Sequence, residues 1–262
     1  MVLLSGATDP YRLIDELYDA EHDGFDEDIE LLLAVTEDLD GPILELGCGS
    51  GRVMLPLAEA GHQVTGVDVS PVMLERARGR VKAVNPNLSI QLAEMDMRST
   101  DPDLGSSFAM AVYSLNGFMH LTAQEDQLRS LRAVHRSLAP SGMVFLDLMN
   151  PVPEYLERIA GHTSLDWSGI LGDGRQVLKW SHREVDIHEQ TIDTSIWYDL
   201  TGNDGQVSRV HTKFVLRYVH LSELDLMLQL AGFGSPTAYG SYELDPLHAQ
   251  SERLIVTAEK VS

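Results

Sequence analysis

The chain has 262 residues, of which 44% are hydrophobic and 23% charged, so it can bury a core as one large domain or as a domain with a modest insertion. Its formal net charge of −21 argues against a nucleic-acid partner, because affinity for a phosphate backbone comes largely from Lys and Arg side chains. No apolar run reaches the roughly 18 residues of a membrane span, which argues against a membrane partner.

Two helices are predicted before the first strand. Apolar residues recur at helical spacing at positions 13, 14, 17 and 18, and again at 29, 32 and 33. His22-Asp23-Gly24 indicates a break between the two helices, and Asp26 is a candidate cap for the second. The sequence Gly41-Pro42 is expected to end the second helix.

From residue 43 onward, short apolar runs alternate with amphipathic helical patterns. The expected strands are residues 43–46, 63–69, 89–93, 108–114, 143–148, 237–242 and 254–259. The expected helices are residues 52–60, 71–84, 124–138 and 222–230, with Ser70 capping the second of them. This alternation predicts an α/β fold: a Rossmann-like, doubly wound, mostly parallel seven-stranded sheet with helices on both faces.

The pattern changes between residues 151 and 220. Three runs, at 176–185, 190–200 and 206–218, are rich in β-branched and aromatic residues and are separated by turn-like sequences. They predict an antiparallel β meander of three strands. We therefore expect residues 41–150 and 221–262 to form one α/β domain, interrupted by an antiparallel insertion at 151–220.

A glycine-rich loop, Gly47-x-Gly49-x-Gly51, lies where the first strand turns into a helix. Glycine allows the backbone to turn tightly and to approach a ligand. The dinucleotide pattern G-x-G-x-x-G would need glycine at position 52, where this chain has Arg52. With Asp68 at the end of the next strand, placed to accept ribose hydroxyls, the spacing favours a nucleoside ligand without a pyrophosphate.

Together with Asp68, the segments 45–51 (ELGCGSG) and 96–98 (DMR) resemble the class I S-adenosylmethionine-dependent methyltransferases. The resemblance covers residues 11–150 and implies that S-adenosylmethionine is the cofactor. It implies that Glu45 and the glycine loop contact the methionine part, Asp68 the ribose, and Asp96 with Met97 the adenine. The candidate cofactor-binding residues are Tyr11, Tyr18, Glu45, Gly47, Cys48, Gly49, Gly51, Arg52, Asp68, Val69, Met73, Asp96, Met97, Arg98, Leu115 and Asn116.

A narrower resemblance is to small-molecule N-methyltransferases, notably the N,N-dimethyltransferases of amino sugars and the glycine N-methyltransferases. It is carried by residues 11–19, by the segment 116–121 (NGFMHL), and by the meander around 174–182. It implies that residues 1–40 form a helical lid over the cofactor and that the insertion covers the substrate. Tyr11 and Tyr18 are the candidate lid contacts, and either is equally typical of a half-buried helix tyrosine.

His120 is the candidate catalytic residue, because it follows the fourth strand and a neutral imidazole can take a proton from an amine. A structural hydrogen bond is the alternative role for His120. The insertion offers further candidates, and alternation along strands prevents all of them from facing one cavity. They are Trp180, His182, Trp197, Tyr198, His211 and Arg217.

The predicted activity is methylation of a small molecule, an amine first, with no metal required. The alternatives are an O-methyltransferase, a protein that binds the cofactor without catalysis, and an NAD-dependent oxidoreductase. The single cysteine, Cys48, suits a reducing compartment, and residues 1–10 lack a signal-peptide pattern, so we expect a cytoplasmic protein. The meander offers a surface for a homodimer.

Overall fold

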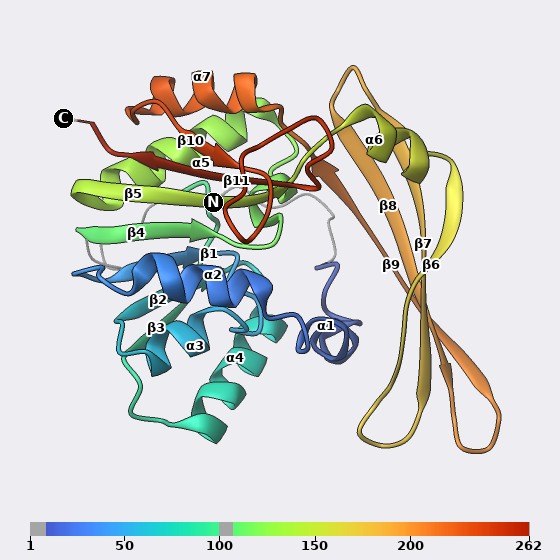
Figure 1. Cartoon of the computed structure of the whole chain (residues 1–262). Helices are drawn as coiled ribbons and strands as arrows, with labels where there is room; N and C mark the ends of the chain where they lie inside the picture. Colours follow the sequence, from blue (N-terminus) through green and yellow to red (C-terminus); the bar gives the residue numbers. More distant parts are fainter. Residues whose placement is uncertain (1–8, 100–106, 262) are drawn as a thin grey trace.

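The computed structural model describes residues 9–99 and 107–261, and contains two separate sheets (Figure 1). The larger sheet has seven strands in the order β10-β11-β5-β4-β1-β2-β3, and only β11 runs against the others. Its strands are β1 (Ile43–Leu46), β2 (Val64–Asp68), β3 (Ile90–Glu94), β4 (Phe108–Tyr113), β5 (Leu138–Met149), β10 (Thr237–Tyr239) and β11 (Arg253–Glu259). The predicted Rossmann-like sheet is confirmed. The start of the predicted lid, residues 1–8, lies outside the described residues.

Helices cover both faces of this sheet because its strands carry apolar side chains on both sides. On one face lie α2 (Glu27–Thr36), α3 (Met54–Glu59) and α4 (Pro71–Val84), which pack against alternate residues such as Ile43 and Val64. On the other face lie α5 (Gln124–Ser137) and α7 (Leu221–Ala231), which pack against Leu44. Figure 1 shows the two layers below and above the sheet.

The predicted helix caps have different outcomes. Ser70 caps α4 as expected, since its Oγ accepts a hydrogen bond from the Met73 N–H at 3.2 Å. Asp26 does occupy the residue before α2, but its side chain makes no capping hydrogen bond.

The second sheet is antiparallel and has four strands, in the order β6-β7-β8-β9, so the expectation of three strands was wrong. They are β6 (His162–Ile170), β7 (Gln176–Asp186), β8 (Thr191–Thr201) and β9 (Val207–Arg217). The strand missed from the sequence is β6, because it is mostly exposed and a bulge between Leu165 and Trp167 breaks its alternation. Helix α6 (Pro153–Ile159) was also missed, although proline is favoured in a first helical turn.

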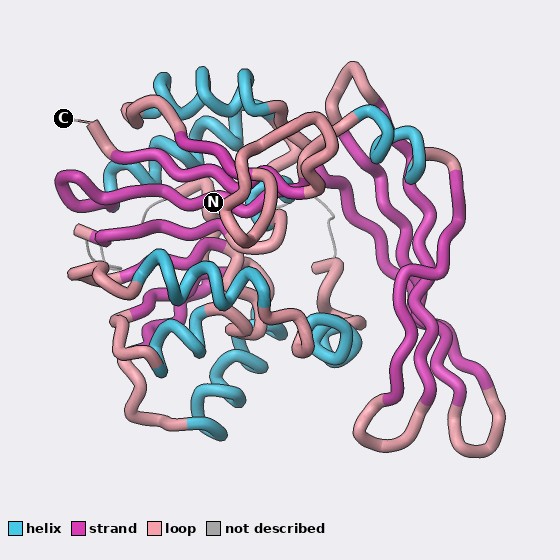
Figure 2. The backbone as a smooth tube through the Cα atoms, in the orientation of Figure 1, coloured by secondary structure: helices cyan, strands magenta, loops and turns pink. Residues whose placement is uncertain are grey.

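Helix α1 (Asp15–His22) lies between the larger sheet and the second sheet in Figures 1 and 2. Its apolar side packs against the second sheet through Ile14 and Leu17. Its Asp19 side chain contacts the larger-sheet domain. It accepts hydrogen bonds from Ser50 Oγ in the glycine loop at 2.5 Å and from Arg76 Nε on α4 at 2.6 Å. The helix therefore joins the two sheets and helps to enclose the space between them. No described helix combines the length and apolar character needed to cross a membrane.

Candidate functional site

A cavity of about 410 Å³ lies at the carboxyl ends of β1, β2 and β4, between those strands, the segment before α1, and β9. Most of the residues predicted as a cofactor site meet in its walls. The predicted residues that line it are Tyr11, Tyr18, Glu45, Gly47, Cys48, Gly49, Arg52, Asp68, Val69, Met73, Met97, Leu115 and His120. Their assignment to a bound cofactor stays a prediction.

The glycine loop forms one wall of the cavity, and its backbone lies close to Met73 and β2. Gly47 and Gly49 have φ values of +74° and +54°, which favour glycine. A Cβ on Gly49 would lie 3.3 Å from Cε of Met73. The N–H groups of Gly47 and Cys48 both donate to the carbonyl of Val67, at 2.8 and 3.0 Å, so the loop is tied to β2.

Asp68 sits at the end of β2 with one backbone donor on each carboxylate oxygen. Gly49 N–H donates to Oδ2 and Ser70 N–H donates to Oδ1, both at 2.8 Å. Each oxygen keeps a lone pair for a further donor, which suits the two neighbouring hydroxyls of a sugar. Burial raises the pKa of Asp68, and the two backbone donors oppose that rise.

Glu45 lies deeper in the cavity wall and is 1% exposed. Its Oε1 accepts a hydrogen bond from Ser114 Oγ at 3.0 Å, whereas Oε2 has no partner among the described residues. Burial raises the pKa of Glu45 to about 7. A buried oxygen left without a donor is costly, so a cationic ligand group fits here.

His120, Tyr11 and Tyr18 form the side of the cavity nearest α1; the role of the two tyrosines as lid contacts stays a prediction. Tyr11 OH lies 3.0 Å from His120 Nε2, and the Tyr11 ring meets the edge of Tyr18 with centroids 5.5 Å apart. Burial lowers the pKa of His120 to about 4, so its imidazole is neutral at neutral pH. The ring of Phe214 from β9 lies 5.5 Å from that of His120.

Four predicted residues do not line the cavity. Gly51 instead allows close packing of the loop, because a Cβ there would lie 2.7 Å from Cε of Met54. Arg98 pairs with Asp96 and, at 2.9 Å, with Asp126 on α5. The Asn116 side chain accepts a hydrogen bond from Met149 N–H at 2.6 Å. None of the four residues, Gly51, Asp96, Arg98 and Asn116, therefore forms part of the wall of this cavity.

The structure also adds wall residues that the sequence reasoning missed. They are Asp9, Pro10, Ser50, Val53, Ser70, Met95, Ser114, Gly117, Lys213, Phe214 and Val215. Ser114 follows β4 directly, as Asp68 ends β2, and that position is the signal that could have identified it. None of the six candidates proposed in the insertion lines the cavity. Tyr198, for example, donates to Glu21 at 3.0 Å, and Arg217 donates to Gln127 at 2.6 Å.

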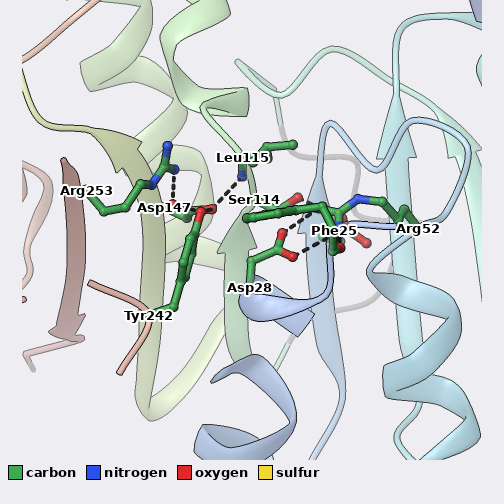
Figure 3. A network of polar contacts seen from close by, with 9 residues as sticks. Phe25, Asp28, Arg52, Ser114, Leu115, Asp147, Tyr242 and Arg253 are labelled. Atoms are coloured by element: carbon green, nitrogen blue, oxygen red, sulfur yellow. Dashed lines mark hydrogen bonds and ion pairs between the residues drawn. The ribbon is translucent and has the colours of Figure 1, made fainter. Parts of the chain in front are cut away.

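The loop that leads to His120 is held by a buried polar network (Figure 3). Leu115 and Asn116 have φ values of +42° and +67°, in the left-handed region. Asp147 accepts the Leu115 N–H on Oδ2 at 3.0 Å and the Asn116 N–H on its backbone carbonyl at 2.8 Å. Arg253 and Tyr242 both contact the Asp147 carboxylate. The network therefore fixes an otherwise unfavourable loop.

Arg52 connects the glycine loop to the chain before the first strand. Its guanidinium donates to the carbonyl of Phe25 at 2.7 Å and to Asp28 at 2.9 Å (Figure 3). Within residues 9–99 and 107–261, no cluster of three His, Cys, Asp or Glu side chains is arranged to hold a metal ion.

Comparisons with known proteins agree on one class of enzyme. A family model described as a methyltransferase domain matches residues 43–142. The cypemycin N-terminal methyltransferase of a Streptomyces species is 31% identical over 228 residues, covering 85% of this chain and 84% of that protein. In fold, the CcbJ methyltransferase from Streptomyces caelestis is similar at a TM-score of 0.73 and 24% identity, covering 90% of both chains. The sugar N-methyltransferase KedS8 from Streptoalloteichus is similar in fold with a TM-score of 0.75 and 20% sequence identity, and the match covers 98% of both chains.

Proposed function

The chain belongs to the class I S-adenosylmethionine-dependent methyltransferases, and on that premise we propose that it methylates an amine nitrogen of a small molecule. The neutral, buried His120 at the cavity wall is the observation that carries the proposal. The similar proteins named for N-methylation support it, since one acts on an N-terminus and another on a sugar.

The donor chemistry explains which residues the cavity needs. When bound, the cofactor supplies a methyl group on a positively charged sulfur. In our proposal Glu45 accepts hydrogen bonds from its ammonium group, because the free Oε2 of Glu45 is the only such buried carboxylate oxygen among the described residues. Asp68 accepts the ribose hydroxyls with its two remaining lone pairs. Met73 and Met97 contribute apolar surface to the same cavity.

His120 is proposed to act on the acceptor. An amine attacks only when its nitrogen is unprotonated and its lone pair is free. A neighbouring carboxylate would stabilise the protonated, cationic amine, whereas a neutral imidazole does not. His120 is neutral and can accept the N–H of the amine, or its proton as the nitrogen becomes positive. Nε2 of that ring lies 3.0 Å from the Tyr11 hydroxyl. In our proposal Nε2 carries the ring proton and donates it to the Tyr11 oxygen, which orients the imidazole and leaves Nδ1 as the nitrogen that accepts from the amine.

The proposed function is tested by transfer of a labelled methyl group from S-adenosylmethionine to matched small amines and alcohols. We expect label on amines and none on alcohols of the same carbon skeleton. Label on alcohols alone would indicate an O-methyltransferase. Calorimetric titration with S-adenosylhomocysteine and with NAD serves as the control for the folded cofactor site.

The raised pKa of Glu45 predicts that binding of S-adenosylhomocysteine depends on pH. The Glu45 pKa of about 7 in the free protein should fall when a cationic ammonium binds, so binding of S-adenosylhomocysteine should release a proton below pH 7. Affinity should then weaken as the pH falls below 7, by at most tenfold per pH unit. Calorimetry in two buffers of different ionisation enthalpy measures the released proton. The release should disappear in Glu45→Gln; an equal release in that variant would show that another group is responsible.

A further inference from the structure

A second cavity, of about 330 Å³, adjoins the first. It lies between the end of β5, helix α6, and strands β7, β8 and β9. Phe214 contributes to the walls of both cavities. The loop after β4 also contributes to both cavities: Leu115 and Gly117 line the first, and Asn116 lines the second. His120 lines the first cavity, and its ring lies 5.5 Å from that of Phe214, so the wall that the two cavities share is next to His120.

The walls of the second cavity are unusually basic for this chain. Four of its 14 lining residues are basic, and one, Glu252, is acidic. The whole chain has 19 Lys and Arg residues against 40 Asp and Glu residues. The four basic residues are Arg158, Lys179, Arg183 and Arg253. A gathering of basic side chains in an acidic protein offers N–H donors to a negative group, provided that its members are not all used by carboxylates of the chain itself.

The four basic residues differ in how far they are already neutralised. Lys179 pairs with Glu21 at 2.5 Å, Arg183 pairs with Asp166 at 2.7 Å, and Arg253 contacts Asp147. Arg158 is exposed and has no ion pair or hydrogen bond to another described side chain. Its guanidinium lies 5.2 Å from the centre of the Tyr155 ring.

Paired arginines keep some of their donors. Arg183 uses only Nη2 toward Asp166, so its other N–H groups are available. Arg158 supplies a full guanidinium on the facing helix α6. A planar fork of this kind matches a carboxylate or a phosphate.

We propose that the second cavity is the acceptor site and that it holds the acceptor through an anionic group, a carboxylate or a phosphate, with Arg158 as the principal contact. The amine of that acceptor then points past Phe214 toward His120. This inference rests on the proposed function, since it names the chemical class of the amine substrate. The volume of about 330 Å³ suits a small molecule.

The test uses the protein saturated with S-adenosylhomocysteine and titrates it with acetate and with inorganic phosphate at constant ionic strength. We expect one of the two ions to bind at one site per chain, and binding to weaken about tenfold in Arg158→Ala, as for loss of a charge-assisted hydrogen bond. The preferred ion distinguishes a carboxylate from a phosphate. The matched control is Arg78→Ala, which should leave ion binding unchanged. Arg78 is an exposed arginine on α4, and among the described residues its ion pair is with Glu75.

Two results would overturn the inference: neither ion binds the wild-type complex, or Arg158→Ala and Arg78→Ala weaken binding equally. Arg158→Lys, which keeps the charge, should recover part of the affinity. Titration with S-adenosylhomocysteine on the same samples distinguishes failure of the acceptor inference from failure of the proposed function. If that ligand binds and the ions do not, the acceptor inference fails alone; if it does not bind, the proposed function fails first.

Discussion

Replacing Asp68 with asparagine should weaken binding of S-adenosylhomocysteine by roughly 100-fold, the loss expected for hydrogen bonds to a charged acceptor. Asp68 receives one N–H from Gly49 and one from Ser70, and has two lone pairs left for the ribose. The amide of asparagine has only one acceptor oxygen, so its NH₂ group would face one of those backbone donors. Both the carboxylate charge and the shape of the loop would change.

Calorimetric titration measures this effect, and Asp186→Asn is its matched control. Asp186 also accepts two backbone N–H groups, from His188 and Glu189, in an exposed turn of the insertion that does not line the cavity. An unchanged dissociation constant in a folded Asp68→Asn protein would show that Asp68 does not hold the cofactor.

Replacing His120 with alanine should lower kcat by about 100-fold, within the usual contribution of a positioned general base, and should change the dissociation constant of S-adenosylhomocysteine only slightly. The reason is that the side chain of His120 contacts Tyr11 and Phe214, whereas Glu45 and Asp68 of β1 and β2 are the residues proposed to hold the cofactor. Burial holds its pKa at about 4, so the neutral ring accepts a proton rather than donates one.

Labelled methyl transfer to the amine found in the panel measures this change. His62→Ala is the matched control, because His62 is half-buried and lies before the amino end of β2, at the opposite edge of the sheet. Unchanged turnover in His120→Ala would leave His120 with a structural role. A parallel loss of cofactor binding would show that the ring supports the cavity rather than the reaction.

Much of the fold followed from the sequence because its signals are local. The run Ile43–Leu46 is apolar apart from Glu45 and enters a glycine loop, so a buried strand and a tight turn were expected there. Ser70 before Pro71 predicted the start of α4 to the residue. The mostly exposed β6 carried no such signal, since its alternation is broken by a bulge.

The site was predictable only in part. Residues at the ends of β1 and β2 could be placed, because parallel strands end at one edge of a sheet. Which face of the second sheet each side chain of the insertion lies on could not be predicted. Alternation permits two registers, and packing against distant elements selects one of them. The structure selected Lys213, Phe214 and Val215 of β9 for the first cavity, where Trp180 and Tyr198 were among the candidates.

By itself, the sequence determined the glycine loop, Asp68 and the alternating α/β pattern, and with them a nucleoside-type cofactor at one edge of a parallel sheet. Those features depend on the conformations of residues close together in the chain. Only the tertiary structure decided that Tyr11 meets His120, 109 residues away, and that Arg158 and Arg183 meet in a second cavity. Contacts of that kind depend on how α1, α6 and the second sheet pack together, and no local pattern encodes that packing.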